Sequence, residues 1–196
     1  MGGDGDMPGT LYANIVSDNG FRRGEAGAAM KLDYDVANPG DYTFYWIKLG
    51  RAVRGKTDAT HTLDLTGCNY LSFWIKGIPD LKKVKVEIHQ DIDANGLFVF
   101  GKDISSFVYT DLYMKGDITS SWKKVVVPLA DFAGIKDWSK MLELVLVFEN
   151  KNGTQRGAVY MDDIMFGYRP PEILIGNRDG NGLKAPQEAS FKVNGV

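Results

Sequence analysis

The densest group of side chains that could do chemistry lies on alternate positions of one predicted strand, residues 83–90. Lys85, Glu87 and His89 share one face of this strand, because successive side chains of a strand point to opposite faces. The other face carries valine and isoleucine. A cation, a carboxylate and an imidazole side by side can bind the polar groups of a ligand, or they can form solvated ion pairs. The sequence leaves both interpretations open.

A tryptophan stands on the polar face of another predicted strand, residues 70–76. The odd positions of this segment are apolar, whereas Trp74 alternates with Ser72 and Lys76 on the opposite face. An indole ring on such a face can stack against the apolar C–H surface of a sugar. We predict that Trp74 shares one ligand groove with the three polar side chains above; the alternative is that it packs beneath a loop.

Two further sets of aromatic side chains are weaker candidates for ligand contact. The strand around Trp46 carries aromatic residues on both faces, so that either Tyr45 or Trp46 belongs to the core. Asp111 and Tyr113 share a face with Tyr109 beside a predicted rim loop. We retain Trp46, Asp111 and Tyr113 as candidate ligand-binding residues.

Catalysis has little support in the sequence. Hydrolysis of a glycosidic bond needs two carboxyl groups roughly 5 to 9.5 Å apart. Along one strand, Glu87 and Asp91 would be about 13 Å apart, and Glu143 and Glu149 about 20 Å. Pairs across strands stay open, but there is no nucleophile elbow or Cys-x-x-Cys motif. We predict no catalytic residues.

Two segments imitate calcium-binding loops. Residues 91–96 match the opening of such a loop, but Lys102 occupies the position that needs a bidentate glutamate, and Asn-Gly is a turn signal. Residues 177–182 have Glu188 at that position, yet they begin with asparagine and lack helical flanks. We interpret the first segment as a turn and do not expect the second to bind calcium.

The elements that must position these residues are strands. No stretch of twelve residues keeps a helical period, while short alternating or apolar segments recur between Gly, Pro, Asn and Asp. Only residues 129–141 could form helical turns. Residues 1–10 and 170–196 have linker composition, which leaves one domain over residues 11–169. The predicted strands are 29–36, 42–49, 70–76, 83–90, 97–101, 107–114, 122–129, 142–148 and 158–166, and they suggest two packed sheets.

The overall composition narrows the function. The 196 residues carry a formal net charge of −2 with a pI near 5.7, which lacks the basic footprint of a nucleic-acid-binding protein. No apolar run reaches the roughly 18 residues of a membrane span. Aromatic residues make up 12% of the chain, more than a core of this size needs.

Four segments of the chain form a recognisable series: residues 27–34 (GAAMKLDY), 71–77 (LSFWIKG), 122–129 (WKKVVVPL, followed by Asp131 and Phe132) and 159–164 (VYMDDI). In this order they resemble the galactose-binding-like jelly-roll superfamily, especially carbohydrate-binding modules of family 11 and related families. The resemblance covers about residues 12–168. The complex I intermediate-associated protein family shares the last two signatures.

The resemblance implies a fold, a ligand and a setting. It implies an all-β fold, a two-sheet antiparallel β-sandwich of the jelly-roll type, with the ligand across the concave sheet. We therefore expect noncatalytic binding of a polysaccharide, a β-glucan or related plant cell-wall glycan. We also expect a secreted or bacterial cell-surface location in a larger multidomain protein, as an accessory domain of a glycoside hydrolase. The alternatives are a jelly-roll lyase or hydrolase, and a protein-interaction module.

The resemblance also implies a structural calcium ion. In such modules the first aspartate of the last-strand motif is often a ligand, and here it is Asp162. Calcium prefers hard oxygen ligands such as carboxylates and loop carbonyls. The adjacent Asp163 should point to the opposite face of the strand, so the two do not form one carboxylate pair. A hydrogen-bonded structural role for Asp162 is the alternative.

Overall fold

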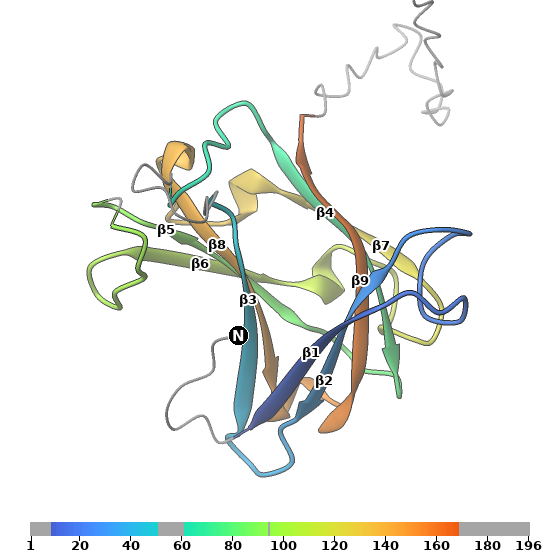
Figure 1. Cartoon of the computed structure of the whole chain (residues 1–196). Helices are drawn as coiled ribbons and strands as arrows, with labels where there is room; N and C mark the ends of the chain where they lie inside the picture. The colour runs from blue at the N-terminus through green and yellow to red at the C-terminus, as the bar shows by residue number, and fades with distance from the viewer. Residues whose placement is uncertain (1–8, 51–60, 94, 169–196) are drawn as a thin grey trace, which may run out of the picture.

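The computed structural model describes residues 9–50, 61–93 and 95–168. These residues form two antiparallel sheets packed face to face, and no α-helix occurs among them (Figure 1). One sheet has the strand order β1-β2-β9-β4-β7 and the other β3-β8-β5-β6. The predicted antiparallel β-sandwich is thereby confirmed. The strands are β1 (Thr10–Val16), β2 (Ala29–Asp35), β3 (Tyr42–Lys48), β4 (Tyr70–Ile78), β5 (Lys85–Gln90), β6 (Ile104–Tyr109), β7 (Lys123–Pro128), β8 (Met141–Glu149) and β9 (Arg156–Gly167).

The core lies between the two sheets and follows from alternation. Leu144, Leu146 and Phe148 of β8 are buried in it, opposite Phe73 and Ile75 of β4. Side chains from the inner faces of two packed sheets interdigitate in this way in β-sandwiches. The same alternation turns every second residue of each strand away from the core, and on the four-stranded sheet those residues build the candidate site.

Four 3₁₀ turns occur in the described residues, two of them where the sequence suggested helical structure. Leu129–Asp131 and Trp138–Lys140 fall within the predicted helical segment 129–141. Asn150–Asn152 follows β8. A fourth turn, Thr110–Leu112, ends β6 earlier than predicted.

One predicted strand was wrong. Residues 97–101 are a loop rather than a strand, although their alternating apolar pattern is typical of one. The carboxylate of Asp103 accepts hydrogen bonds from the backbone N–H groups of Ile92 and Val99, which gives this backbone partners outside a sheet.

The strand β1 was missed. It pairs with β2 at the edge of the five-stranded sheet, and most of its side chains are exposed. Without a buried face it lacks the hydrophobic signal that marked the other strands. β1 begins at Thr10, the last residue of the predicted N-terminal segment.

Other predictions fall on residues that the structure does not describe. The predicted tail over residues 170–196, with the second calcium-like segment, lies outside the described residues, as do residues 1–8. Within the described ranges, no helix has the length and apolar character needed to cross a membrane.

The core assignment predicts the cost of truncating β8. We expect Leu146→Ala to lower the free energy of unfolding by about 3 kcal/mol, because it removes buried methyl groups and leaves a cavity. For a domain of this size, that corresponds to a fall of roughly 6 to 12 °C in melting temperature, measurable by calorimetry. Ile15→Ala is the matched control, since Ile15 is 73% exposed on β1. Equal melting temperatures for the two variants would contradict this packing.

Candidate functional site

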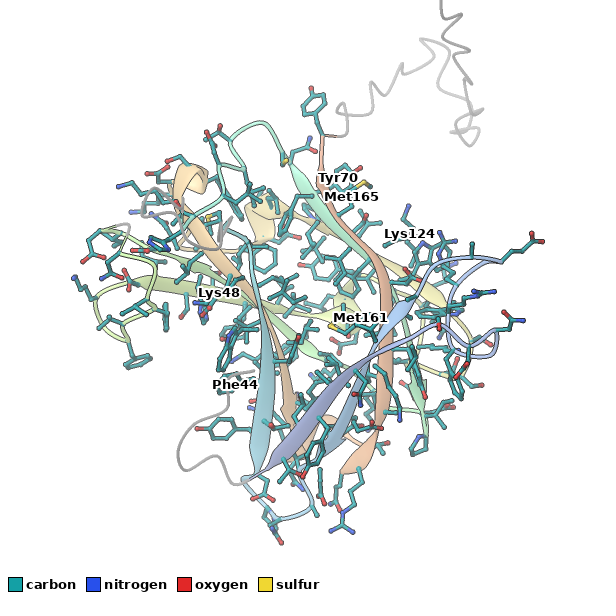
Figure 2. The ribbon with its side chains drawn as sticks, viewed as in Figure 1. Phe44, Lys48, Tyr70, Lys124, Met161 and Met165 are labelled. Carbon is teal, nitrogen blue, oxygen red and sulfur yellow. The ribbon has the colours of Figure 1, made fainter. Side chains whose placement is uncertain are left out.

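A groove of about 780 Å³ lies over the face of the four-stranded sheet that points away from the core. Its volume falls within the range of small-molecule sites in proteins. Figure 2 shows Phe44 and Lys48 of β3 on this side of the molecule, while Lys124 and Met165 lie on the far side, over the other sheet. The groove is lined by Tyr42, Phe44, Trp46 and Lys48 of β3, Lys85, Glu87 and His89 of β5, Ser105 and Phe107 of β6, Glu143, Val145, Val147 and Glu149 of β8, and Leu97, Phe98 and Phe100 of the β5–β6 loop.

The middle of the groove floor is aromatic and apolar. Trp46 lies opposite Val145, and Phe44 lies opposite Val147, in the register of β3 and β8. The rings of Phe44 and Trp46 are tilted, with centroids 5.4 Å apart. On the far strand, Phe107 is 51% exposed and pairs with Glu87. The floor therefore offers rings on β3 and β6, with the valines of β8 and the Lys85–Glu87 ion pair of β5 between them.

A row of polar side chains crosses the sheet at one end of the groove. The register places Lys48, Glu143, His89 and Ser105 side by side on β3, β8, β5 and β6. Lys48 Nζ lies 2.7 Å from Glu143 Oε2, and His89 Nδ1 lies 2.8 Å from Glu143 Oε1. These contacts join three strands through their side chains.

The network continues along β5. His89 Nε2 lies 3.2 Å from Glu87 Oε2, and Lys85 forms an ion pair with the other oxygen of Glu87. His89 is thus held between two carboxylates, each of which also pairs with a lysine. His89 and Glu143 are almost fully buried.

The network sets the protonation states of the floor. Burial favours neutral His89, but its hydrogen bonds to Glu143 and Glu87 outweigh burial and raise the pKa of the imidazole. Burial likewise disfavours ionised Glu87 and Glu143, yet hydrogen bonds from His89 and from a lysine lower the pKa of both carboxyl groups. The pKa of Glu149 is also lowered: its hydrogen bonds, with Lys151 first, outweigh desolvation.

These pKa directions bear on catalysis. A glycosidase needs one carboxyl group that is still protonated near neutral pH, with its pKa raised by its surroundings. The three glutamates of the groove show the opposite shift. They suit fixed hydrogen-bond acceptors better than proton donors.

The wall of the groove at this end is the loop between β5 and β6. Phe98 stacks on His89, with ring centroids 3.9 Å apart and planes inclined by 20°. Asp91 accepts a hydrogen bond of 2.7 Å from the backbone N–H of Gly96. Asp91 and Asp103 therefore brace this loop from its two ends.

The structure brings four predicted ligand-binding residues together and decides one open choice. Lys85, Glu87, His89 and Trp46 all line the groove, whereas Tyr45 packs against the core. Their role in binding remains a prediction.

Several groove residues were missed in the sequence. They include Phe44 and Tyr42, which share the parity of Trp46, and Glu143, which was considered only as a possible catalytic carboxylate. Phe98 and Phe100 gave no usable signal, because they lie in a loop that was predicted to be a strand.

The prediction that Trp74 shares one ligand groove with these residues was wrong. Trp74 belongs to β4, in the other sheet, and faces the outer side of the sandwich beside Lys124. The guanidinium of Arg23 lies 4.6 Å from its ring centroid. Alternation identified the face of the strand, but the sequence does not show which sheet a strand joins.

Two of the weaker ligand-binding candidates, Asp111 and Tyr113, also lie away from the groove. The hydroxyl of Tyr113 donates to Asp131 over 2.9 Å, and its ring packs against the core. Asp111 forms an ion pair of 3.7 Å with Lys83. Both follow the end of β6, where a 3₁₀ turn replaces the predicted continuation of the strand.

The loop that carries Arg23 is fixed to the outer face of the five-stranded sheet. Lys76 is almost fully buried, and its Nζ donates to the carbonyl oxygen of Gly20 over 2.7 Å. The same ammonium lies 4.9 Å from the ring centroid of Trp122 and 5.0 Å from that of Tyr160, within the range of cation–π attraction. This loop reaches Asp162 from the same side.

Asp162 has hydrogen-bond partners that do not suggest a metal ligand. Its Oδ2 accepts from the backbone N–H of Arg23 over 3.1 Å, and its Oδ1 accepts from that of Asp163 over 2.8 Å. The Arg23 guanidinium pairs with Asp163. Asp163 has a φ of 50°, and the pairing of β4 with β9 shifts register beside it, so strict alternation fails and Arg23 contacts both aspartates.

The residues around Asp162 do not fit calcium. Calcium takes six to eight oxygen ligands, whereas here a guanidinium lies beside the aspartate pair. Within the described ranges, one group of three acidic or histidine side chains is close enough to share an ion. It consists of Asp91, Asp93 and Asp103, which are distant from Asp162 in the sequence. Lys102 already forms an ion pair with Asp93 there.

One protein family and several solved structures match this chain. The family described as Carbohydrate binding domain 30 matches residues 17–168. The family 30 module of a cellulosomal cellulase of Clostridium thermocellum has a similar structure, with a TM-score of 0.57 and 19% identity over 80% of this chain and 83% of that one.

Two other solved structures share the fold. A family 11 module of Clostridium thermocellum, in complex with a β-1,3-1,4-mixed-linked tetrasaccharide, has a TM-score of 0.58 and 18% identity over 84% of this chain and 85% of that one. An exo-β-agarase matches with a TM-score of 0.53 and 14% identity over 82% of this chain, but only 22% of its own. Among curated proteins, the search found no match.

The carboxylate pair around His89 predicts its titration. In a His61→Gln variant, His89 is the sole histidine, and its ring protons can be followed by NMR. We expect a midpoint above the ordinary value of 6.5, and a lower midpoint after Glu143→Gln. The stability contributed by protonated His89 is complete below about pH 6.5 and is lost as the pH rises through the raised folded-state pKa. A midpoint at or below 6.5 would contradict the network.

The surroundings of Asp162 predict the effect of chelation. We expect EDTA treatment of protein prepared with calcium to leave the melting temperature unchanged. A calcium ion present at ~100 times its dissociation constant would add roughly 2.7 kcal/mol, or about 5 to 10 °C for this domain. A fall of that size with EDTA, absent from Asp162→Asn, would instead establish Asp162 as a calcium ligand.

Proposed function

The chain belongs to the carbohydrate binding domain 30 family, and from this we propose that it binds β-glucan chains in the groove over its four-stranded sheet, without cleaving them. The observation that carries the proposal is the combination of an aromatic floor with ionised side chains that are paired to one another. The shape, the rings and the charges of the groove each support it.

The rings suit the faces of sugars. Aromatic side chains stack against apolar C–H surface and still leave the hydroxyls at the rim of a sugar free for hydrogen bonds. In the groove, Trp46 and Phe44 lie on β3, and the half-exposed Phe107 lies across the floor on β6. A chain of sugars lying on the floor between them would contact rings from both sides.

The charges favour a neutral polymer. Lys48 pairs with Glu143, and Lys85 pairs with Glu87, so each of these lysines already has an anionic partner in the groove. An acidic polysaccharide would have to compete with these glutamates for the lysines. The hydroxyls of a glucan can hydrogen-bond to the same paired groups without separating them.

The comparisons support the glucan in particular. A structurally similar family 11 module was solved with a β-1,3-1,4-mixed-linked tetrasaccharide, and other similar modules come from cellulosomal cellulases. The agarase match covers about a fifth of that enzyme, which supports a place for this chain beside other domains. We propose that the chain works outside the cell, as a targeting domain of a glycan-degrading protein.

Paired tryptophan variants test the function. We expect Trp46→Ala to weaken binding of a β-1,3-1,4-glucan oligosaccharide tenfold or more in calorimetric titration, because stacking over ~60 Å² of ring is worth roughly 1.5 kcal/mol. Trp74→Ala removes the same side chain from the other sheet and should bind like the wild type. Melting curves of both variants show whether each is folded.

Two results would count against the proposal. Wild-type protein that binds no β-glucan would refute the ligand class, and equal losses in the two tryptophan variants would refute the location. A reducing-sugar assay with the same glucan should stay at the level of buffer, and release of sugar would show an enzyme instead.

A further inference from the structure

We propose that the tip of the β5–β6 loop, Leu97 with Phe100, is an additional sugar-contacting subsite that extends the groove beyond the sheet. The inference rests on the proposed function, since the occupant is the continuing glucan chain. It predicts that the domain distinguishes long chains from short ones through a loop, while the floor holds the central sugars.

The exposure of the tip is the first observation. Phe100 is 92% exposed and Leu97 is 66% exposed, although both line the groove. Exposed apolar side chains are ordinary when scattered singly, but adjacent ones at the end of a concave site mark a surface that gains free energy when covered. A phenyl ring that has nearly its whole surface in water can stack on a sugar without first leaving another contact.

The second observation is that the loop is held in place before any ligand binds. Asp91 accepts from the N–H of Gly96 over 2.7 Å, and Asp103 accepts from the N–H of Val99 over 2.7 Å. Between these two braces, Phe98 stacks on the buried His89. A subsite that is already ordered loses little conformational entropy on binding, which favours affinity.

The position of the loop indicates which part of a ligand would contact its tip. It leaves the sheet at the end of β5 and returns at the start of β6, beside the polar row that contains His89 and Ser105 (Figure 1). Leu97 and Phe100 line the same continuous hollow as Trp46. A sugar chain that rests on the groove floor and is longer than the floor therefore meets these two side chains next.

The test compares oligosaccharides of two lengths. We expect Phe100→Ala to weaken binding of a β-1,3-1,4-glucan hexasaccharide roughly tenfold, equivalent to about 1.4 kcal/mol, and to change binding of the tetrasaccharide by less than about twofold. Leu97→Ala should show the same dependence on length with a smaller effect. Tyr12→Ala is the matched control, because Tyr12 is a 69% exposed aromatic residue on β1 of the other sheet.

The outcomes separate this inference from the proposed function. Wild-type protein that binds neither oligosaccharide refutes both. Wild-type binding with no loss in Phe100→Ala, or with equal loss for the two lengths, overturns the subsite and leaves the groove intact. A wild-type dimer in sedimentation that Phe100→Ala converts to a monomer also overturns it, because the tip then covers a second copy.

Discussion

The burial of two glutamates in the floor of the groove is the constraint on which the site depends. A carboxylate removed from water is costly unless charged or hydrogen-bonding partners compensate for it. His89 compensates for both Glu87 and Glu143, and a lysine completes each pair. Because the partners come from β3, β5 and β8, the register of three strands is tied to one charge network. The rings beside it inherit their positions from that register.

Much of the architecture was readable from alternation, because a strand between a core and a polar surface has to show it. The pattern of residues 83–90 identified both the core face and the groove face of β5. Ile47 is apolar and shares a strand face with Tyr45, which was a signal that Tyr45 faces the core and Trp46 does not.

The alternation of side chains does not show which strands pair with one another in a sheet. Trp74 has the parity of a ligand-facing residue, but its strand pairs with β7 and β9 instead of joining the other sheet. The strand prediction for the β5–β6 loop was wrong for a different reason. The apolar side chains of this loop alternate as in a strand, but aspartate carboxylates accept the hydrogen bonds of its backbone N–H groups. At Asp163 a bulge reset the alternation that had been assumed.

The position of β9 has a consequence for how the chain is made. The last described strand lies inside the five-stranded sheet, with β2 on one side and β4 on the other (Figure 1). Met30 pairs with Met161, so this contact closes a very long loop, and closing such loops slows folding. On a ribosome, β1 and β2 can form a hairpin early, but they stay unattached to β4 until β9 has left the exit tunnel. Synthesis of nearly the whole domain must therefore precede formation of its sandwich.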